Sequence, residues 1–237
     1  MTTEYKNKYF SLLGDSISTL SGYNPPDNAV FYEWENMRAS GVFTVEDTWW
    51  GKVINELGAK LLINESFSGS TVCKLPQWQI ESYGCSDLRT GRLGNDEKTP
   101  DVIMILMGIN DWGWGVRIYP EGENDGLDVF AVAYSEMLNK IKANYPHSEI
   151  WCLTLPKSKW SKHPEIEIPE AKSGGRLNDY GKAIRACGEK AGCRVLDIYR
   201  PQDRYDTIDG FHPTAEGMEC IANAVLCALK RGECHDN

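Results

Sequence analysis

The sequence has few of the residues that metal sites need and none of their usual spacings. Only four histidines occur in 237 residues, and the chain contains neither a Cys-x-x-Cys nor a His-Glu-x-x-His pattern. Because zinc sites commonly draw their ligands from such patterns, we predict no metal and no other cofactor. The eight cysteines are typical of buried thiols that act as small hydrophobic residues, since a disulfide framework is unusual in a chain of this length.

Long apolar runs and an excess of basic charge are also missing. The longest strongly apolar stretch covers residues 102–107, far short of the roughly 20 residues that a membrane-spanning helix requires. The formal net charge of -9 disfavours binding to nucleic acid or to an anionic membrane surface. The first residues, Met1 to Lys6, include an acid and begin no hydrophobic segment, so they do not resemble a secretory signal. We therefore predict a cytoplasmic protein that binds neither nucleic acid nor membrane.

No linker-like stretch, internal repeat or low-complexity segment divides the chain. With 41% hydrophobic residues, its length suffices for one substantial core. We therefore predict a single domain over residues 1–237. Two long segments that contain proline and glycine, 21–46 and 157–175, are expected to be loop insertions, and loops of this size often serve as lids.

Runs rich in Val, Ile and Leu alternate with amphipathic stretches along the chain. The runs cover residues 8–14, 60–65, 101–107, 149–155 and 194–198. Most are continuously apolar, which indicates parallel strands buried on both faces. Helices are predicted between and after them, at 47–58, 126–144, 176–191 and 214–230. This order predicts an α/β fold, a three-layer α/β/α sandwich with a central, mainly parallel five-stranded sheet of the flavodoxin-like kind.

A candidate nucleophile follows the first predicted strand, which ends at Gly14-Asp15-Ser16. A serine becomes nucleophilic when a neighbouring base takes its proton and a third group fixes the tautomer of that base. Asp209 and His212, three residues apart near the other end of the chain, could supply both groups from one turn or helical segment. Taken alone, this pair is equally consistent with a solvated loop acid beside a helix-capping histidine. The presence of Ser16 favours a catalytic triad.

Two further residues could stabilise the negative charge of a tetrahedral intermediate. Asn110 follows the predicted strand 101–107 and can donate through its side-chain amide. Gly69 follows the strand at 60–65, and its backbone N–H could approach the same oxygen, although a loop glycine is more often only a turn residue. Asp15 and Asp111 adjoin these candidates, and we assign both to local hydrogen bonding within their loops.

Four blocks in this order resemble the SGNH hydrolases, also called the GDSL esterases and lipases. They are Gly14-Asp15-Ser16-Ile17-Ser18, the Gly69 segment, Gly108-Ile109-Asn110-Asp111 and Asp209-Gly210-Phe211-His212-Pro213. The resemblance implies that Ser16 is the nucleophile and that His212 is the general base, oriented by Asp209. It also implies an oxyanion hole formed by Ser16, Gly69 and Asn110. One departure is Ser18, where the family has leucine, and it leaves these roles untouched.

Trp112 and Trp114, two of eight tryptophans, follow Asn110 directly and could line an acyl or alcohol pocket, although ordinary packing is the alternative for each. By analogy with the open cleft of the family, we predict a serine ester hydrolase that forms an acyl-enzyme and acts on short acyl esters, such as acetyl esters of carbohydrates. A thioesterase or acyltransferase of the same fold and a non-catalytic carbohydrate-binding domain are the alternatives. The sequence gives no indication of the natural substrate or the oligomeric state.

Overall fold

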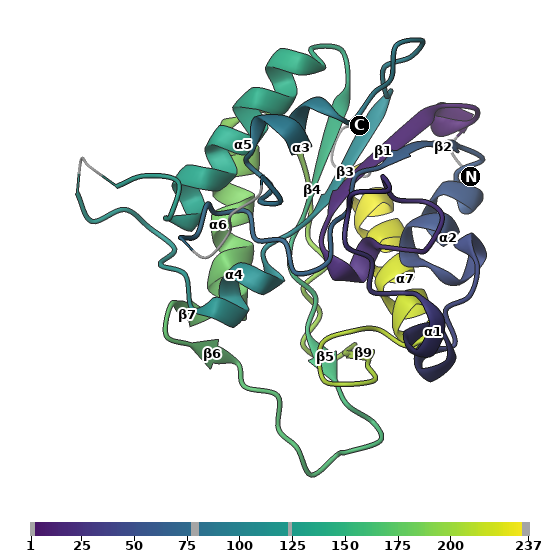
Figure 1. Ribbon diagram of the computed structural model, residues 1–237, viewed down its shortest axis with the longest axis vertical. Helices are drawn as coiled ribbons and strands as arrows, with labels where there is room; N and C mark the ends of the chain where they lie inside the picture. Colours follow the sequence, from purple (N-terminus) through teal and green to yellow (C-terminus); the bar gives the residue numbers. More distant parts are fainter. Residues whose placement is uncertain (1–2, 77–80, 123–124, 234–237) are drawn as a thin grey trace.

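Five parallel strands form the central sheet of the protein (Figure 1). The computed structural model describes residues 3–76, 81–122 and 125–233 of the chain. The strands are β1 (Tyr9–Gly14), β2 (Lys60–Asn64), β3 (Val102–Leu106), β4 (Glu149–Leu153) and β8 (Arg194–Leu196). Each coincides with a predicted strand, because the continuous apolar runs mark strands covered on both faces. Every residue of β3 is buried.

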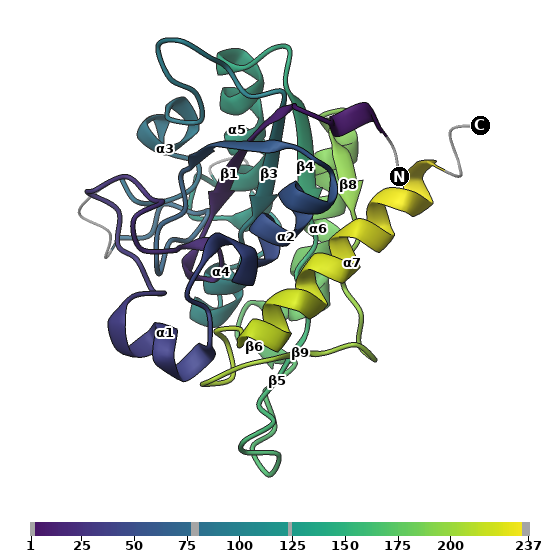
Figure 2. The ribbon, with the colours of Figure 1, turned by 90° about the vertical axis from the view of Figure 1, so that its right-hand side faces the viewer.

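Helices cover both faces of the sheet and complete the three-layer α/β/α sandwich (Figures 1 and 2). On one face α2 (Trp49–Glu56) packs against α7 (Ala215–Glu233). On the other, α5 (Phe130–Asn144) packs against α6 (Leu177–Lys190) and the short α3 (Asp87–Gly91). The four longer helices confirm the four that were predicted. Among the described residues, no helix has the length and apolar character needed to span a membrane.

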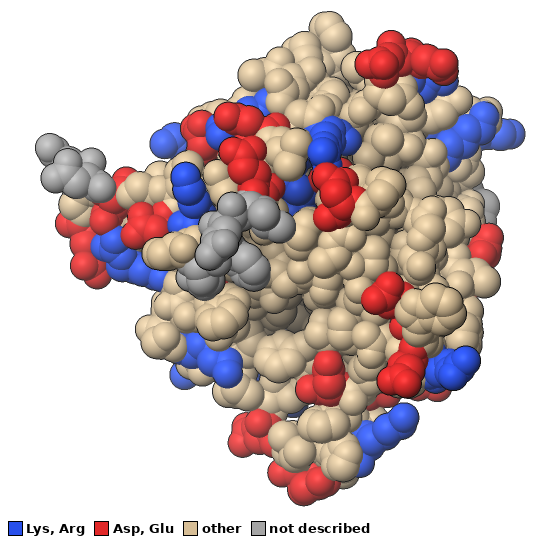
Figure 3. Space-filling model, in the orientation of Figure 1, with Lys and Arg blue, Asp and Glu red and all other residues tan. Residues whose placement is uncertain are grey.

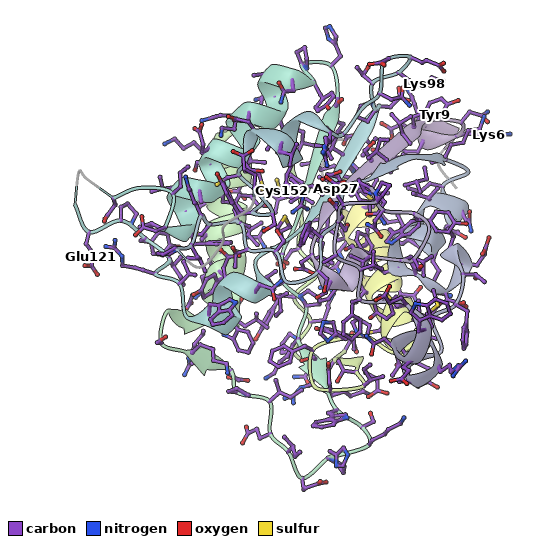
Figure 4. The ribbon with its side chains drawn as sticks, viewed as in Figure 1. Lys6, Tyr9, Asp27, Lys98, Glu121 and Cys152 are labelled. Atoms are coloured by element: carbon purple, nitrogen blue, oxygen red, sulfur yellow. The ribbon has the colours of Figure 1, made fainter. Side chains whose placement is uncertain are left out.

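Several short elements lie outside the predicted set. They are the 3-10 helices Thr3–Tyr5, Ser16–Ser18 and Val45–Asp47, the helices α1 (Trp34–Ser40) and α4 (Ile109–Trp114), and the strands β5 (Ser158–Lys159), β6 (Ala171–Lys172), β7 (Gly175–Arg176) and β9 (Tyr205–Asp206). The chain between β5 and β6 extends away from the sandwich in Figure 1. A second excursion, which carries Glu121, projects from the side of the molecule where α5 and α6 lie (Figure 4).

The strand order β2-β1-β3-β4-β8 places the topological switch point of the sheet beside β1. In open parallel sheets, ligands bind beyond the carboxyl ends of the strands at such a point. Because β1 pairs with both β2 and β3 in parallel, the loops that follow these three strands leave the same edge of the sheet. This edge therefore brings together the segments that contain Ser16, Gly69 and Asn110.

Candidate active site

Ser16, His212 and Asp209 form a hydrogen-bonded chain at this edge. The Ser16 Oγ lies 3.0 Å from His212 Nε2, although the two residues are 196 positions apart in the sequence. The other ring nitrogen, Nδ1, lies 2.6 Å from the Asp209 Oδ2. Ser16 begins a 3-10 helix directly after the loop that ends β1. A serine, an imidazole and a carboxylate in this order have the geometry of a nucleophile, its base and the group that orients the base.

A tight turn directs the Asp209 carboxylate toward His212. Its Oδ1 accepts the backbone N–H groups of Phe211 at 3.0 Å and His212 at 2.8 Å, which leaves Oδ2 for the imidazole. Gly210 occupies a positive φ of 95° in this turn. Partial burial would raise the pKa of Asp209, but the hydrogen bonds from the His212 side chain and backbone outweigh it and lower that pKa. The carboxylate is therefore ionised where it can stabilise an imidazolium.

The three predicted N–H donors, from Ser16, Gly69 and Asn110, lie on the loops that follow β1, β2 and β3. Within the described part of the chain, the backbone N–H groups of Ser16 and Gly69 have no acceptor. The Asn110 side-chain amide donates to the Ser70 carbonyl at 2.9 Å, and its second hydrogen is left for another acceptor. This bond also ties Asn110 to the loop of Gly69, whose φ of 80° favours glycine. The predicted donors Gly69 and Asn110 therefore lie on connected loops.

The two acids beside these candidates hold the loops in place. The Asp15 Oδ1 accepts the N–H of Ile17 at 3.0 Å, which confirms the predicted local role. The same prediction was wrong for Asp111, whose carboxylate accepts the N–H groups of Val72 at 2.8 Å and Cys73 at 3.0 Å. Asp111 thus binds the segment that follows Gly69, and its partner Val72 lies 39 positions away in the sequence. Burial raises the pKa of both acids, that of Asp15 to about 7.

Arg89, on α3, is a buried residue that holds two of these loops together, and the sequence alone did not indicate this role. Its guanidinium donates to the Gly14 carbonyl at 2.9 Å and to the Ser70 Oγ at 2.8 Å, so one side chain connects the loops of Ser16 and Gly69. It also pairs with the buried Glu65 carboxylate, with 3.2 Å between Nε and Oε1. Burial lowers the pKa of Arg89 to about 10 and raises that of Glu65. No recognisable motif marks these two residues.

Residues 21–46, predicted to be an insertion, contact the base directly. The ring of Phe31 is stacked on the imidazole of His212. Next to it, the Tyr32 hydroxyl donates to the Pro213 carbonyl at 2.9 Å. These contacts join the insertion to the segment that carries Asp209 and His212. In the sequence, Phe31 and Tyr32 are two aromatic residues in a long loop. Nothing in this pattern predicts that they contact His212 and Pro213.

The two tryptophans of α4 lie in different surroundings. Trp114 is 62% exposed and lines a hollow of about 300 Å³ next to Ser16. Its lining comprises Ser16, Ile17, Ile109, Asn110, Gly113, Trp114, Phe211 and His212. Trp112 is 1% exposed, packs beside Phe211 and lines a separate cavity on the other side of Ile109. In Figure 3 a hollow is visible between the positions of α4 and β5, and the surface next to it is uncharged.

Comparison with known proteins identifies the class of the chain. The sequence profile of the GDSL-like Lipase/Acylhydrolase family matches residues 8–166. A Bacteroides ovatus protein assigned as a GDSL-like lipase is 27% identical, with a TM-score of 0.72 over 95% of this chain and 99% of that one. A Bacteroides uniformis protein assigned in the same way is 26% identical, with a TM-score of 0.69 over 95% and 96%. The chain belongs to the GDSL-like lipase/acylhydrolase family.

A more distant solved structure has the same fold. A family two carbohydrate esterase from Clostridium thermocellum, in complex with cellohexaose, is 15% identical, with a TM-score of 0.57 over 95% of this chain and 64% of that one. The sequence matches none of the curated proteins. Family membership and the shared fold together make this protein an ester hydrolase.

Proposed function

We propose that the protein is a serine esterase that works through an acyl-enzyme intermediate. The observation that carries this proposal is the hydrogen-bonded chain from Ser16 through His212 to Asp209. The Ser16 Oγ attacks the ester carbonyl while His212 Nε2 takes its proton. The resulting oxyanion accepts hydrogen bonds from the N–H groups of Ser16 and Gly69 and from the Asn110 amide.

The intermediate then collapses, and His212 gives the proton to the departing alcohol. Water enters, loses a proton to His212 and attacks the acyl carbon of the serine ester. The second intermediate then collapses, His212 returns the proton to the Ser16 oxygen, and the carboxylic acid is released. Asp209 stabilises the imidazolium that forms twice in this cycle and does not itself need to take up a proton.

We propose short acyl groups, such as acetyl, carried on carbohydrate hydroxyls as the substrates. In the hollow beside Ser16, apolar lining is supplied by Ile17, Ile109 and Trp114, among others. An exposed indole face such as that of Trp114 suits the apolar face of a sugar ring. The shared fold with a carbohydrate esterase is consistent with this substrate class but does not define it.

Covalent labelling tests the serine mechanism directly. A fluorophosphonate probe should modify Ser16, as identified by peptide mass spectrometry, and should inactivate hydrolysis of 4-nitrophenyl acetate. Ser16→Ala should lose both labelling and hydrolysis, whereas the exposed Ser21→Ala should keep both. Hydrolysis by Ser16→Ala at the wild-type rate would exclude the serine mechanism. A panel of acetylated sugars and aliphatic esters of graded chain length then defines the substrate class.

A further inference from the structure

A second cavity lies next to the hollow that contains Ser16. Ile109 lines both spaces, and the rings of Trp112 and Phe211, one from each lining, have centroids 6.1 Å apart. The Ser158 hydroxyl, in the wall of the second cavity, donates to the Gly210 carbonyl at 2.8 Å. The cavity therefore adjoins the turn that presents Asp209 and His212.

Basic side chains outnumber acidic ones in the lining of this cavity, although the whole chain has a net charge of -9. The charged lining residues are Lys157, Arg176 and Lys182 against Glu170 and Asp179. Nearby, the Lys172 Nζ lies 5.5 Å from the ring centroid of Trp112. Figure 3 shows Lys and Arg surface over the hairpin of β6 and β7. The local field therefore favours an anion.

Each of the two acids has a lysine as its ion-pair partner, which leaves Arg176 without a close partner among the described residues. Lys157, only 8% exposed, pairs with Glu170, and the Lys182 Nζ lies 2.8 Å from the Asp179 carboxylate. No carboxylate of the described residues lies within ion-pair distance of the exposed Arg176, and its positive charge contributes to the lowered pKa of both Glu170 and Asp179. A guanidinium presents several N–H donors in a planar fork that fits a carboxylate. The exposed Arg176 guanidinium is consequently accessible to a ligand.

We propose that this cavity binds a carboxylate on the alcohol part of the ester substrate, with Arg176 as its main partner. The inference rests on the proposed function, in which the acyl group is short, so the alcohol part is the group that we assign to the second cavity. The space of about 120 Å³ is smaller than a cavity of about 150 Å³ that holds benzene, so it suits a carboxylate-bearing group rather than a sugar chain. The substrates are then acyl esters of hydroxylated acids.

Two probes of nearly equal shape separate charge from size. They are 4-acetoxybutanoate and its neutral analogue 4-acetoxybutanamide, and their dissociation constants are measured by calorimetry with Ser16→Ala protein, in which the proposed nucleophile is absent. The carboxylate should bind about tenfold more tightly, as expected for a charge-assisted hydrogen bond. This preference should fall as salt is raised. Equal affinity for the two probes would overturn the proposal.

Substitution of Arg176 tests whether this side chain causes the preference for the carboxylate. Adding Arg176→Met should make the two affinities equal, while Arg176→Lys should restore part of the difference. Lys190→Met is the matched control, because it removes one positive charge from the exposed far end of α6 and should keep the preference. A preference that survives Arg176→Met would place the anion elsewhere and overturn the proposal.

Turnover by the wild-type protein distinguishes the two proposals. If the preference for the carboxylate is measured but the wild type hydrolyses neither ester, carboxylate binding by the cavity stands and the serine esterase proposal fails. If the wild type hydrolyses both esters with equal kcat/KM and binding shows no preference, the cavity proposal alone fails.

Discussion

The ring of Phe31 lies flat on the imidazole of His212, with 3.4 Å between the ring centroids and 10° between the ring planes. The hydrogen bond to Asp209 fixes one edge of the imidazole, and the Phe31 ring covers one of its faces. Together they limit rotation of the base and keep water from that face. A π face beside a ring that becomes cationic is also electrostatically favourable.

Replacement of Phe31 tests this stacking. Phe31→Ala should lower kcat about tenfold, because the cation–π contribution of about 1 kcal/mol and the restraint on the imidazole are both lost. The measurement is steady-state hydrolysis of 4-nitrophenyl acetate across pH. Phe43→Ala, which truncates an exposed phenylalanine of residues 21–46, is the control and should keep the wild-type rate. An unchanged kcat in Phe31→Ala would reduce the contact to simple packing.

Asp209→Asn tests the orienting carboxylate. The asparagine oxygen can still accept the N–H groups of Phe211 and His212, so the turn should persist and the melting temperature should change little. The amide would favour the wrong tautomer of His212, and kcat should fall by about 10⁴. Comparison of kcat with the thermal unfolding curve separates the two effects. A loss of less than about tenfold would show that His212 is oriented without the carboxylate.

Asn110→Ala tests the third oxyanion donor. Its removal should lower kcat by about 10²- to 10³-fold with a small change in KM, since the hydrogen bond strengthens only as negative charge develops. Asn144→Ala is a matched control, because that amide also donates to a backbone carbonyl, that of Thr90, in another part of the fold. A change in KM with constant kcat would instead assign Asn110 to substrate binding.

The sequence predicted the sheet because burial on both faces leaves a continuous apolar run that needs no knowledge of the partner strands. It also identified Ser16, Asp209 and His212 as candidates, since short motifs retain the residue types that the chemistry requires. Stacking of Phe31 on His212 could not be predicted, because it depends on how a long loop packs against a segment far along the chain.

Other features were hidden for different physical reasons. Arg89 lies in a short polar stretch, and only the folded structure shows that its charge is buried against Glu65. Trp112 and Trp114 are close in the sequence, but residues two positions apart on a helix point to opposite sides. The structure accordingly buries Trp112 and exposes Trp114.

Arg89→Met should be strongly destabilising. The change leaves the Glu65 carboxylate without its partner and removes the donor to the Gly14 carbonyl. Loss of one member of a buried ion pair costs about 3–5 kcal/mol, which urea unfolding would measure. Adding Glu65→Gln should recover part of that loss, because the uncompensated charge is then gone. A loss below about 1 kcal/mol in the single variant would show that the pair contributes little to stability.

Asp15→Asn should stabilise the protein at alkaline pH. Burial raises the pKa of Asp15 to about 7, whereas an exposed aspartate has a pKa of about 3.9. The folded state therefore holds a proton that the unfolded state has lost, and stability from this group decreases as pH rises from about 4 to 7. Asparagine carries no charge and keeps an oxygen to accept the Ile17 N–H. The gain in melting temperature should be small near pH 4 and reach at least about 2–4 °C at pH 8.

Asp47 should show the opposite pH dependence of stability, because its pKa is lowered whereas that of Asp15 is raised. It is only partly buried, and hydrogen bonds from the backbone of Phe43 and Thr44 outweigh that burial and lower its pKa. Asp47→Asn should therefore lower the melting temperature at pH 8, and the loss should shrink as pH falls below the pKa of an exposed aspartate. Thermal unfolding of both variants between pH 3 and 8 should give differences of opposite sign at pH 8, and the difference for Asp47→Asn should shrink below about pH 4. Parallel curves for wild type and Asp15→Asn across this range would mean that the buried Asp15 carboxyl does not titrate as described.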